Sequence, residues 1–217
     1  MTGRLPEWMV KDLSWPRLRR YIRAAHGDAD VAARLYWWNI QVSGALIGPL
    51  HCLELALRNA LHEGMARQYG RPDWWKVAPL SDRGAELVQK AQRTRRRRPR
   101  TPDDVVAELT FGFWVSLMAK GYDRHFWVPA LHRAFPHYQG SRDDLHDALE
   151  SLRLLRNRVM HHEPVHHRDL AADHAKIYRV LGYLSAELAK EAAAMDRTPE
   201  VLADREAFLH DSRPPRF

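Results

Sequence analysis

Leucine recurs in this chain at spacings of three and four residues, which is the spacing of one face of an α-helix. The clearest run comprises Leu46, Leu50, Leu53, Leu57 and Leu61. Gly70 and Pro72 follow this run and predict where its helix ends. A separate, earlier helix is expected over about residues 30–42. No segment shows the two-residue alternation typical of a strand, so the pattern favours an all-α fold.

Further helices carry recognisable start signals. A helix is expected over residues 81–92, and residues 101–104 (Thr-Pro-Asp-Asp) combine a capping threonine, an early proline and acidic residues in the first turn. Ser141 caps a long helix expected over 142–162. Apolar residues at alternating four- and three-residue spacings predict another helix over 170–188. Thr198 is expected to cap a last short helix.

These segments predict a single all-α domain that covers residues 1–217. The hydrophobic content of 45% is sufficient for one sizeable core. No linker divides the chain, and the only candidate break is the arginine-rich segment 93–100, whose like charges repel one another and predict a loop.

The formal net charge of +7 favours a polyanionic partner such as nucleic acid or an anionic membrane, although a solvated basic face would give the same balance. The expected RNA contacts are Arg95, Arg96, Arg97, Arg98 and Arg158. The single cysteine, Cys52, cannot form a disulfide within the chain, which fits a reducing compartment. Segment 44–61 is the most apolar, but proline and charged residues interrupt it. We therefore expect no membrane span. We expect a cytoplasmic location.

Residues 156–163 read Arg-Asn-Arg-Val-Met-His-His-Glu and place groups suited to RNA cleavage near one helix end. A histidine can remove the proton of a ribose 2′-hydroxyl near neutral pH, since its unperturbed pKa is about 6.5. The hydroxyl then attacks the adjacent phosphate, leaving a 2′,3′-cyclic phosphate. Arginine can hold the phosphate oxygens, and asparagine can orient the imidazole. The candidate catalytic residues are Arg156, Asn157, His161 and His162.

The geometry of an ideal helix, with about 100° per residue, separates these side chains. Relative to Leu145, Arg156 falls at about 20°, within the apolar stripe, and therefore needs a partner. Asn157 and His161 fall at about 120° and 160°, and Leu154 at about 180°. An exposed leucine beside polar residues is expected of a dimer face. A shared site requires the arginine stem to bend, or a second subunit to complete it.

Three blocks of the sequence carry a family resemblance. They are residues 53–61 with Tyr69-Gly70 and Trp74-Trp75 after them, residues 111–117, and residues 155–164. Together they resemble the Abi-like (abortive infection) proteins of bacteria, within the HEPN superfamily. The HEPN signature is an arginine, four to six residues and a histidine, often with asparagine directly after the arginine. His161 satisfies the four-residue version and His162 the five-residue version, so both stay open.

The resemblance implies a HEPN-type helical bundle with its core over about 30–195 and extra helices at both ends. Many HEPN proteins are endoribonucleases that need no metal or other cofactor, and the motif helices of two domains usually form a composite cleft. The resemblance therefore implies RNA as substrate, a homodimer, and a toxin-like or phage-defence role with a possible antitoxin protein as partner. Supporting roles are expected for Glu54, Arg58 and Asn59. Glu54 either forms a local ion pair with Arg58 or holds Arg156 in place.

Other functions are compatible with the same residues. Some HEPN domains bind RNA or protein without catalysis, and the basic surface would serve that role as well. A metal site could be built from His161, His162, His166 and His167. Pro164 separates these two pairs, and no cysteine or His-Glu-x-x-His spacing accompanies them, so no metal is expected.

Overall fold

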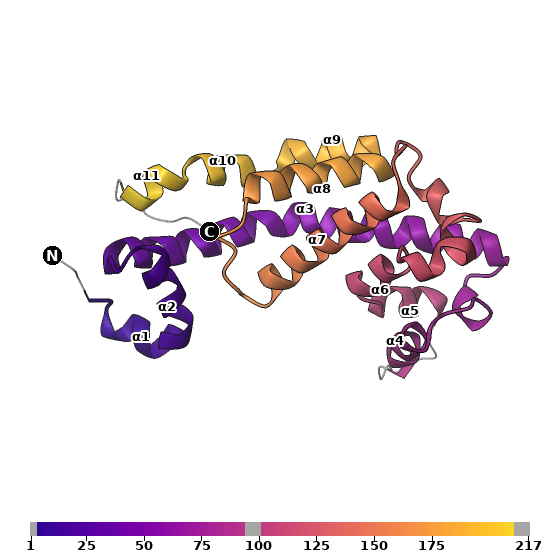
Figure 1. Ribbon diagram of the computed structural model, residues 1–217, viewed down its shortest axis with the longest axis horizontal. Helices are drawn as coiled ribbons and strands as arrows, with labels where there is room; N and C mark the ends of the chain where they lie inside the picture. The colour runs from indigo at the N-terminus through magenta and orange to yellow at the C-terminus, as the bar shows by residue number, and fades with distance from the viewer. Residues whose placement is uncertain (1–3, 94–100, 211–217) are drawn as a thin grey trace. The chain divides into compact units, whose positions relative to one another are not determined.

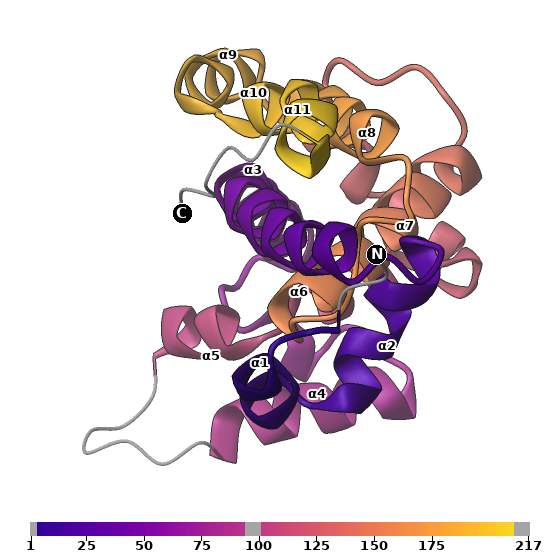
Figure 2. The same cartoon turned by 90° about the vertical axis from the view of Figure 1, so that its left-hand side faces the viewer.

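The computed structural model describes residues 4–93 and 101–210. Every regular element in these residues is a helix, so the all-α prediction is confirmed (Figures 1 and 2). Arg95, Arg96, Arg97 and Arg98 lie outside the described residues, and their expected RNA contacts stay predictions.

Contacts between residues divide the chain into two compact units. Unit 1 comprises Met1–Leu50, Leu155–Ala175 and Ala193–Phe217, and unit 2 comprises His51–Leu154 and Lys176–Ala192. Four helices, namely α3, α7, α8 and α9, each contribute residues to both units. No linker segment therefore marks the boundary in the described chain, and the single domain stays a prediction.

Unit 1 is built around the N-terminal part of α3. Its helices are α1 (Glu7–Leu13), α2 (Trp15–Ala24), α10 (Thr198–Ala203), α11 (Arg205–His210) and parts of α3 (Ala29–Tyr69), α7 (Arg142–Met160), α8 (Leu170–Leu184) and α9 (Ala186–Met195). Two hydrogen bonds tie α10 and α11 to α3. Trp38 Nε1 donates to the Val201 carbonyl at 3.1 Å, and Arg34 Nε donates to the Leu209 carbonyl at 2.6 Å.

Unit 2 has an aromatic core. Besides its parts of α3, α7, α8 and α9, it holds η1 (Trp74–Lys76), α4 (Asp82–Arg93), α5 (Pro102–Glu108), α6 (Phe111–Ser116), η2 (Lys120–Tyr122), η3 (Asp123–Trp127) and η4 (Leu131–Ala134). Trp74, Phe113 and Trp114 are fully buried and contact one another edge to face or stacked. Trp74 Nε1 donates to His62 Nδ1 at 3.1 Å. Burial lowers the pKa of His62, which keeps this nitrogen available as an acceptor.

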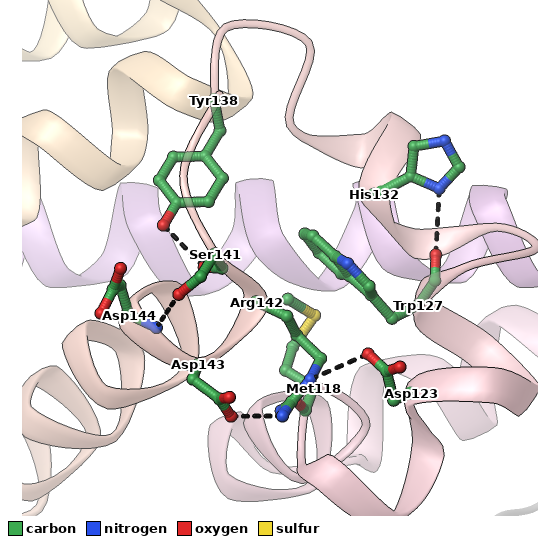
Figure 3. A network of polar contacts seen from close by, with 9 residues as sticks. All are labelled: Met118, Asp123, Trp127, His132, Tyr138, Ser141, Arg142, Asp143 and Asp144. Atoms are coloured by element: carbon green, nitrogen blue, oxygen red, sulfur yellow. Dashed lines mark hydrogen bonds and ion pairs between the residues drawn. The ribbon is translucent and has the colours of Figure 1, made fainter.

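The start of α7 is fixed by a buried arginine (Figure 3). Arg142 donates to the Met118 carbonyl at 2.6 Å and to Asp123 Oδ1 at 3.1 Å, and it also pairs with Asp143. Ser141 caps the helix as predicted, because its Oγ accepts from the Asp144 amide at 3.0 Å. The carboxylates and the carbonyl compensate the cost of burying the guanidinium charge.

Four predicted helix boundaries are wrong. The helix expected over 30–42 and the next one form one helix, α3, because the buried face continues through Ala45, Leu46, Pro49 and Leu50. Helix α7 ends at Met160, not at 162. The helix expected over 170–188 breaks at Ser185, whose Oγ accepts from the Leu188 amide at 3.1 Å. Thr198 is the first residue of α10, and Asp196 Oδ1 accepts from its amide at 2.8 Å.

Helix α3 is also long and apolar enough to cross a membrane by length and composition. A core helix of a soluble protein meets the same criteria, and the leucines of the predicted stripe are buried within the protein. The cytoplasmic location therefore stays a prediction.

Gly48 offers a direct test of the uninterrupted helix. A Cβ atom at this exposed position would have no heavy atom within 4 Å. We expect Gly48→Ala to raise the free energy of unfolding by about 0.5–1 kcal/mol, because alanine loses less backbone entropy than glycine in a helix. Urea denaturation measures this change. A decrease would contradict the continuous helix.

Candidate functional site

The four candidate catalytic residues occupy the last turn of α7 and the turn that follows it. Arg156 and Asn157 are half-buried within the helix, whereas His161 and His162 lie beyond its end and are exposed. The leucines and valine of the predicted stripe are buried, and Leu154 is 48% exposed, as the helix geometry predicts. Arg156 takes part in a polar or electrostatic interaction.

The turn after α7 is a Schellman motif with histidine where glycine is usual. The Glu163 amide donates to the Arg158 carbonyl at 2.8 Å, and the His162 amide donates to the Val159 carbonyl at 3.2 Å. His162 has φ of 56°, in the left-handed region. A residue with a Cβ atom is strained there, although histidine is among the side chains that tolerate it best. Such strain at an exposed histidine is a pointer to function.

Two contacts from elsewhere in unit 1 hold this turn. Arg17 of α2 donates through Nη1 to the His162 carbonyl. Asn39 of α3 is buried, and its Oδ1 accepts from the Val165 amide at 2.7 Å and from the His166 amide at 3.1 Å. The turn is thus fixed to α2 on one side and to α3 on the other, which sets the position of the His162 side chain.

His162 borders two hollows of unit 1. The first, which we call the α3 cavity, has a volume of about 470 Å³. Its apolar walls are Ile40, Ile47, Val159 and Met160, with Gly44 also on the α3 side. Its polar groups come from Arg17, Tyr21, Tyr36, Asn39, Ser43 and His162. The volume lies within the range of about 300–1,000 Å³ that is usual for small-molecule sites.

The second, the arginine hollow, has a volume of about 320 Å³. It is lined by Ser14, Pro16, Arg17, Arg20, His162, Glu163 and Pro164. Arg17 and His162 border both hollows, so the α3 cavity and the arginine hollow meet at this pair. The arrangement brings arginines, which can bind a phosphate, beside a histidine, which can transfer a proton.

The tyrosines of the cavity are neutral at physiological pH. Tyr21 and Tyr36 lie edge to face with ring centroids 5.2 Å apart. Burial raises the pKa of Tyr21 well above its usual value, and the neighbouring Tyr36 adds to the rise. Burial likewise raises the pKa of Tyr36. Their hydroxyl groups therefore act as hydrogen-bonding groups and not as bases.

Other predicted site residues occupy different surroundings. Arg158 pairs with Glu163 at 3.4 Å, and both are partly exposed. Glu54, Arg58 and Asn59 belong to unit 2, where Arg58 Nε donates to Asn59 Oδ1 at 3.2 Å. The supporting roles of these three residues stay predictions, as do both proposed partners of Glu54.

The alternative metal site is not assembled in the described part of the chain. No group of three or more His, Cys, Asp or Glu residues there could hold a metal ion. His166 instead packs against the Tyr21 ring, with centroids 4.9 Å apart.

The sequence did not indicate the contribution of α2. Arg17 and Arg20 lie far from residue 156 along the chain, and nothing in their local spacing predicts which helix they face. Comparison of the chain with protein-family models, curated proteins and solved structures found no match. The resemblance to HEPN proteins therefore rests on the sequence blocks alone.

The burial of His166 predicts an acid-sensitive unit 1. Desolvation lowers the pKa of His166 from 6.5 to about 4. Between these values the unfolded chain binds the proton more readily, so the free energy of unfolding falls as the pH falls from about 6.5 to about 4. We expect His166→Phe, which keeps a ring against Tyr21, to reduce this slope in urea denaturation.

Burial also lowers the pKa of His167, so part of the slope is expected to remain in the variant. An unchanged pH dependence in His166→Phe would show that another group is responsible.

Proposed function

We propose that this protein is a metal-independent endoribonuclease in which His162 moves the proton. The observation that carries the proposal is the place of His162, at the junction of an arginine-lined hollow and a cavity of ligand size. The resemblance to HEPN proteins supports the same activity. The net charge of +7 favours a polyanionic substrate.

In the proposed reaction, a phosphodiester of RNA lies against Arg17 and Arg20. His162 removes the proton of the neighbouring 2′-hydroxyl, and the 2′-oxygen forms a bond to phosphorus. The bond from phosphorus to the 5′-oxygen breaks, and that oxygen takes a proton from the exposed His161 or from water. The guanidinium groups stabilise the charge that develops on the phosphate oxygens.

Arg156 and Asn157 keep the roles that the resemblance implies. Arg156 lines neither hollow and is half-buried, so within a single chain Arg17 is better placed to meet the phosphate. A second copy could contribute its own Arg156, as the composite cleft of HEPN proteins implies. A cytoplasmic, toxin-like or phage-defence role, and an antitoxin protein as partner, belong to the same proposal.

Replacing His162 by glycine separates chemistry from folding. Glycine adopts the left-handed conformation freely, so we expect His162→Gly to leave the free energy of unfolding unchanged or to raise it by up to about 1 kcal/mol. Cleavage of total RNA should nevertheless fall by at least about 100-fold, which is the usual contribution of a general base. The assay is run in a metal chelator, with detection of new 2′,3′-cyclic phosphate ends.

His26→Gly is the matched control, because His26 is also an exposed histidine in the left-handed region and lines neither hollow. If His162→Gly cleaves like the unmodified protein, His162 is not the base. If RNA binds but no strand is cut over hours, the protein is the non-catalytic binding module instead. Complete loss of cleavage in the chelator would exclude a metal-independent reaction.

The dimer can be tested at Leu154. This side chain is 48% exposed on α7, and apolar groups of this size favour burial in an interface. We expect the unmodified protein to have the mass of a dimer in light scattering and Leu154→Asp that of a monomer. A monomeric mass for both proteins would contradict the homodimer.

A further inference from the structure

The α3 cavity is larger than a site of proton transfer requires. A base, an arginine and a phosphate need only the junction of the two hollows, yet the cavity extends from that junction along α3 to Ile47 and has a volume of about 470 Å³. Such a space beside the proposed phosphate-binding pair fits a ligand that has a second, largely apolar part.

The lining of the cavity specifies the chemistry of that part. Ile40, Ile47, Val159 and Met160 offer apolar surface, whereas Asn39, Ser43 and the neutral tyrosines offer amide and hydroxyl groups. A planar group with apolar faces and hydrogen-bonding edges matches this mixture, and a nucleobase has both features. The arginine hollow matches the phosphate that such a group would carry.

We propose that the α3 cavity holds one unpaired nucleobase while the adjoining phosphate lies in the arginine hollow. The substrate class is therefore single-stranded RNA, because a base in a duplex is stacked and paired and cannot enter a cavity without being extruded. This inference rests on the proposed function for its choice of RNA. The claim about binding stands apart from catalysis, since it requires no step of cleavage.

Gly44 gives a way to close the cavity without damaging the fold. It lines the α3 cavity from the middle of α3, and a Cβ atom there would meet no heavy atom within 4 Å. A leucine at this position is expected to fill the space that a base would use. Gly48, one helical turn further along α3, has equally open surroundings and lines neither hollow, so Gly48→Leu is the matched control.

The binding experiment uses a short RNA with 2′-O-methyl groups, which lacks the attacking hydroxyl and cannot be cut. Fluorescence anisotropy compares this strand, alone and paired with its complement, on the unmodified protein and on both glycine variants. We expect the single strand to bind more tightly than the duplex. Gly44→Leu should weaken binding of the single strand by at least about fivefold, the effect of losing one stacked base, and Gly48→Leu should not.

The arginine hollow is tested by salt dependence in the same assay. Both Arg19 and Arg20 are exposed, but only Arg20 lines the hollow. Losing one phosphate contact reduces the slope of log affinity against log salt by about 0.7 for a single strand. We expect this reduction in Arg20→Gln and not in Arg19→Gln, and we expect Gly44→Leu to leave the slope unchanged.

The outcomes separate the cavity from the catalytic proposal. If the uncut strand binds in the expected pattern but unmodified RNA is never cleaved, the base site stands and the nuclease does not. If RNA is cleaved but Gly44→Leu binds and cleaves like the unmodified protein, the nuclease stands and the base site is overturned. Equal affinity for the single strand and the duplex also overturns the base site, whatever the variants do.

Discussion

The left-handed turn at His162 is the constraint on which the candidate site depends. It is closed by backbone hydrogen bonds from Glu163 to Arg158 and from His162 to Val159. It is held in place by Arg17 on its carbonyl and by Asn39 on the two amides at 165 and 166. A glycine would meet the backbone requirement with less strain, and the proposed proton transfer gives the histidine at this position a role.

The same turn lies where two different environments meet. On one side lie guanidinium groups of α2, and on the other lies a cavity with apolar walls and neutral hydroxyl groups. The buried Tyr21 ring of α2 packs against both Tyr36 of α3 and His166 after the turn. The hydrogen bonds of Asn39 and the aromatic contacts of Tyr21 therefore stabilise the same part of unit 1.

Much of the helical architecture was predictable from local signals. The capping box at Thr101 and Asp104, the cap at Ser141 and the buried stripe of α7 follow from residues a few positions apart, and the structure has all three. It was harder to predict whether a helix continues past Gly44, Gly48 and Pro49, because this depends on the apolar surface that follows them. A proline inside α3 is tolerated where the buried face runs on unbroken.

The site was predictable only in part. The motif placed the histidines correctly near the end of α7, but the left-handed turn depends on backbone hydrogen bonds that no side-chain pattern encodes. Arg17 and the buried Asn39 contact residues more than 100 positions away in the chain. Contacts of this kind arise from tertiary packing, which periodicity and capping signals do not specify.

The most direct measurement is a crystal structure of the protein with a 2′-O-methyl dinucleotide. Our expectation is one base within the α3 cavity, with the phosphate in hydrogen-bonding reach of Arg17 and the ribose 2′-position facing the His162 imidazole. A dinucleotide bound on another surface, with both hollows empty at saturating concentration, would contradict it.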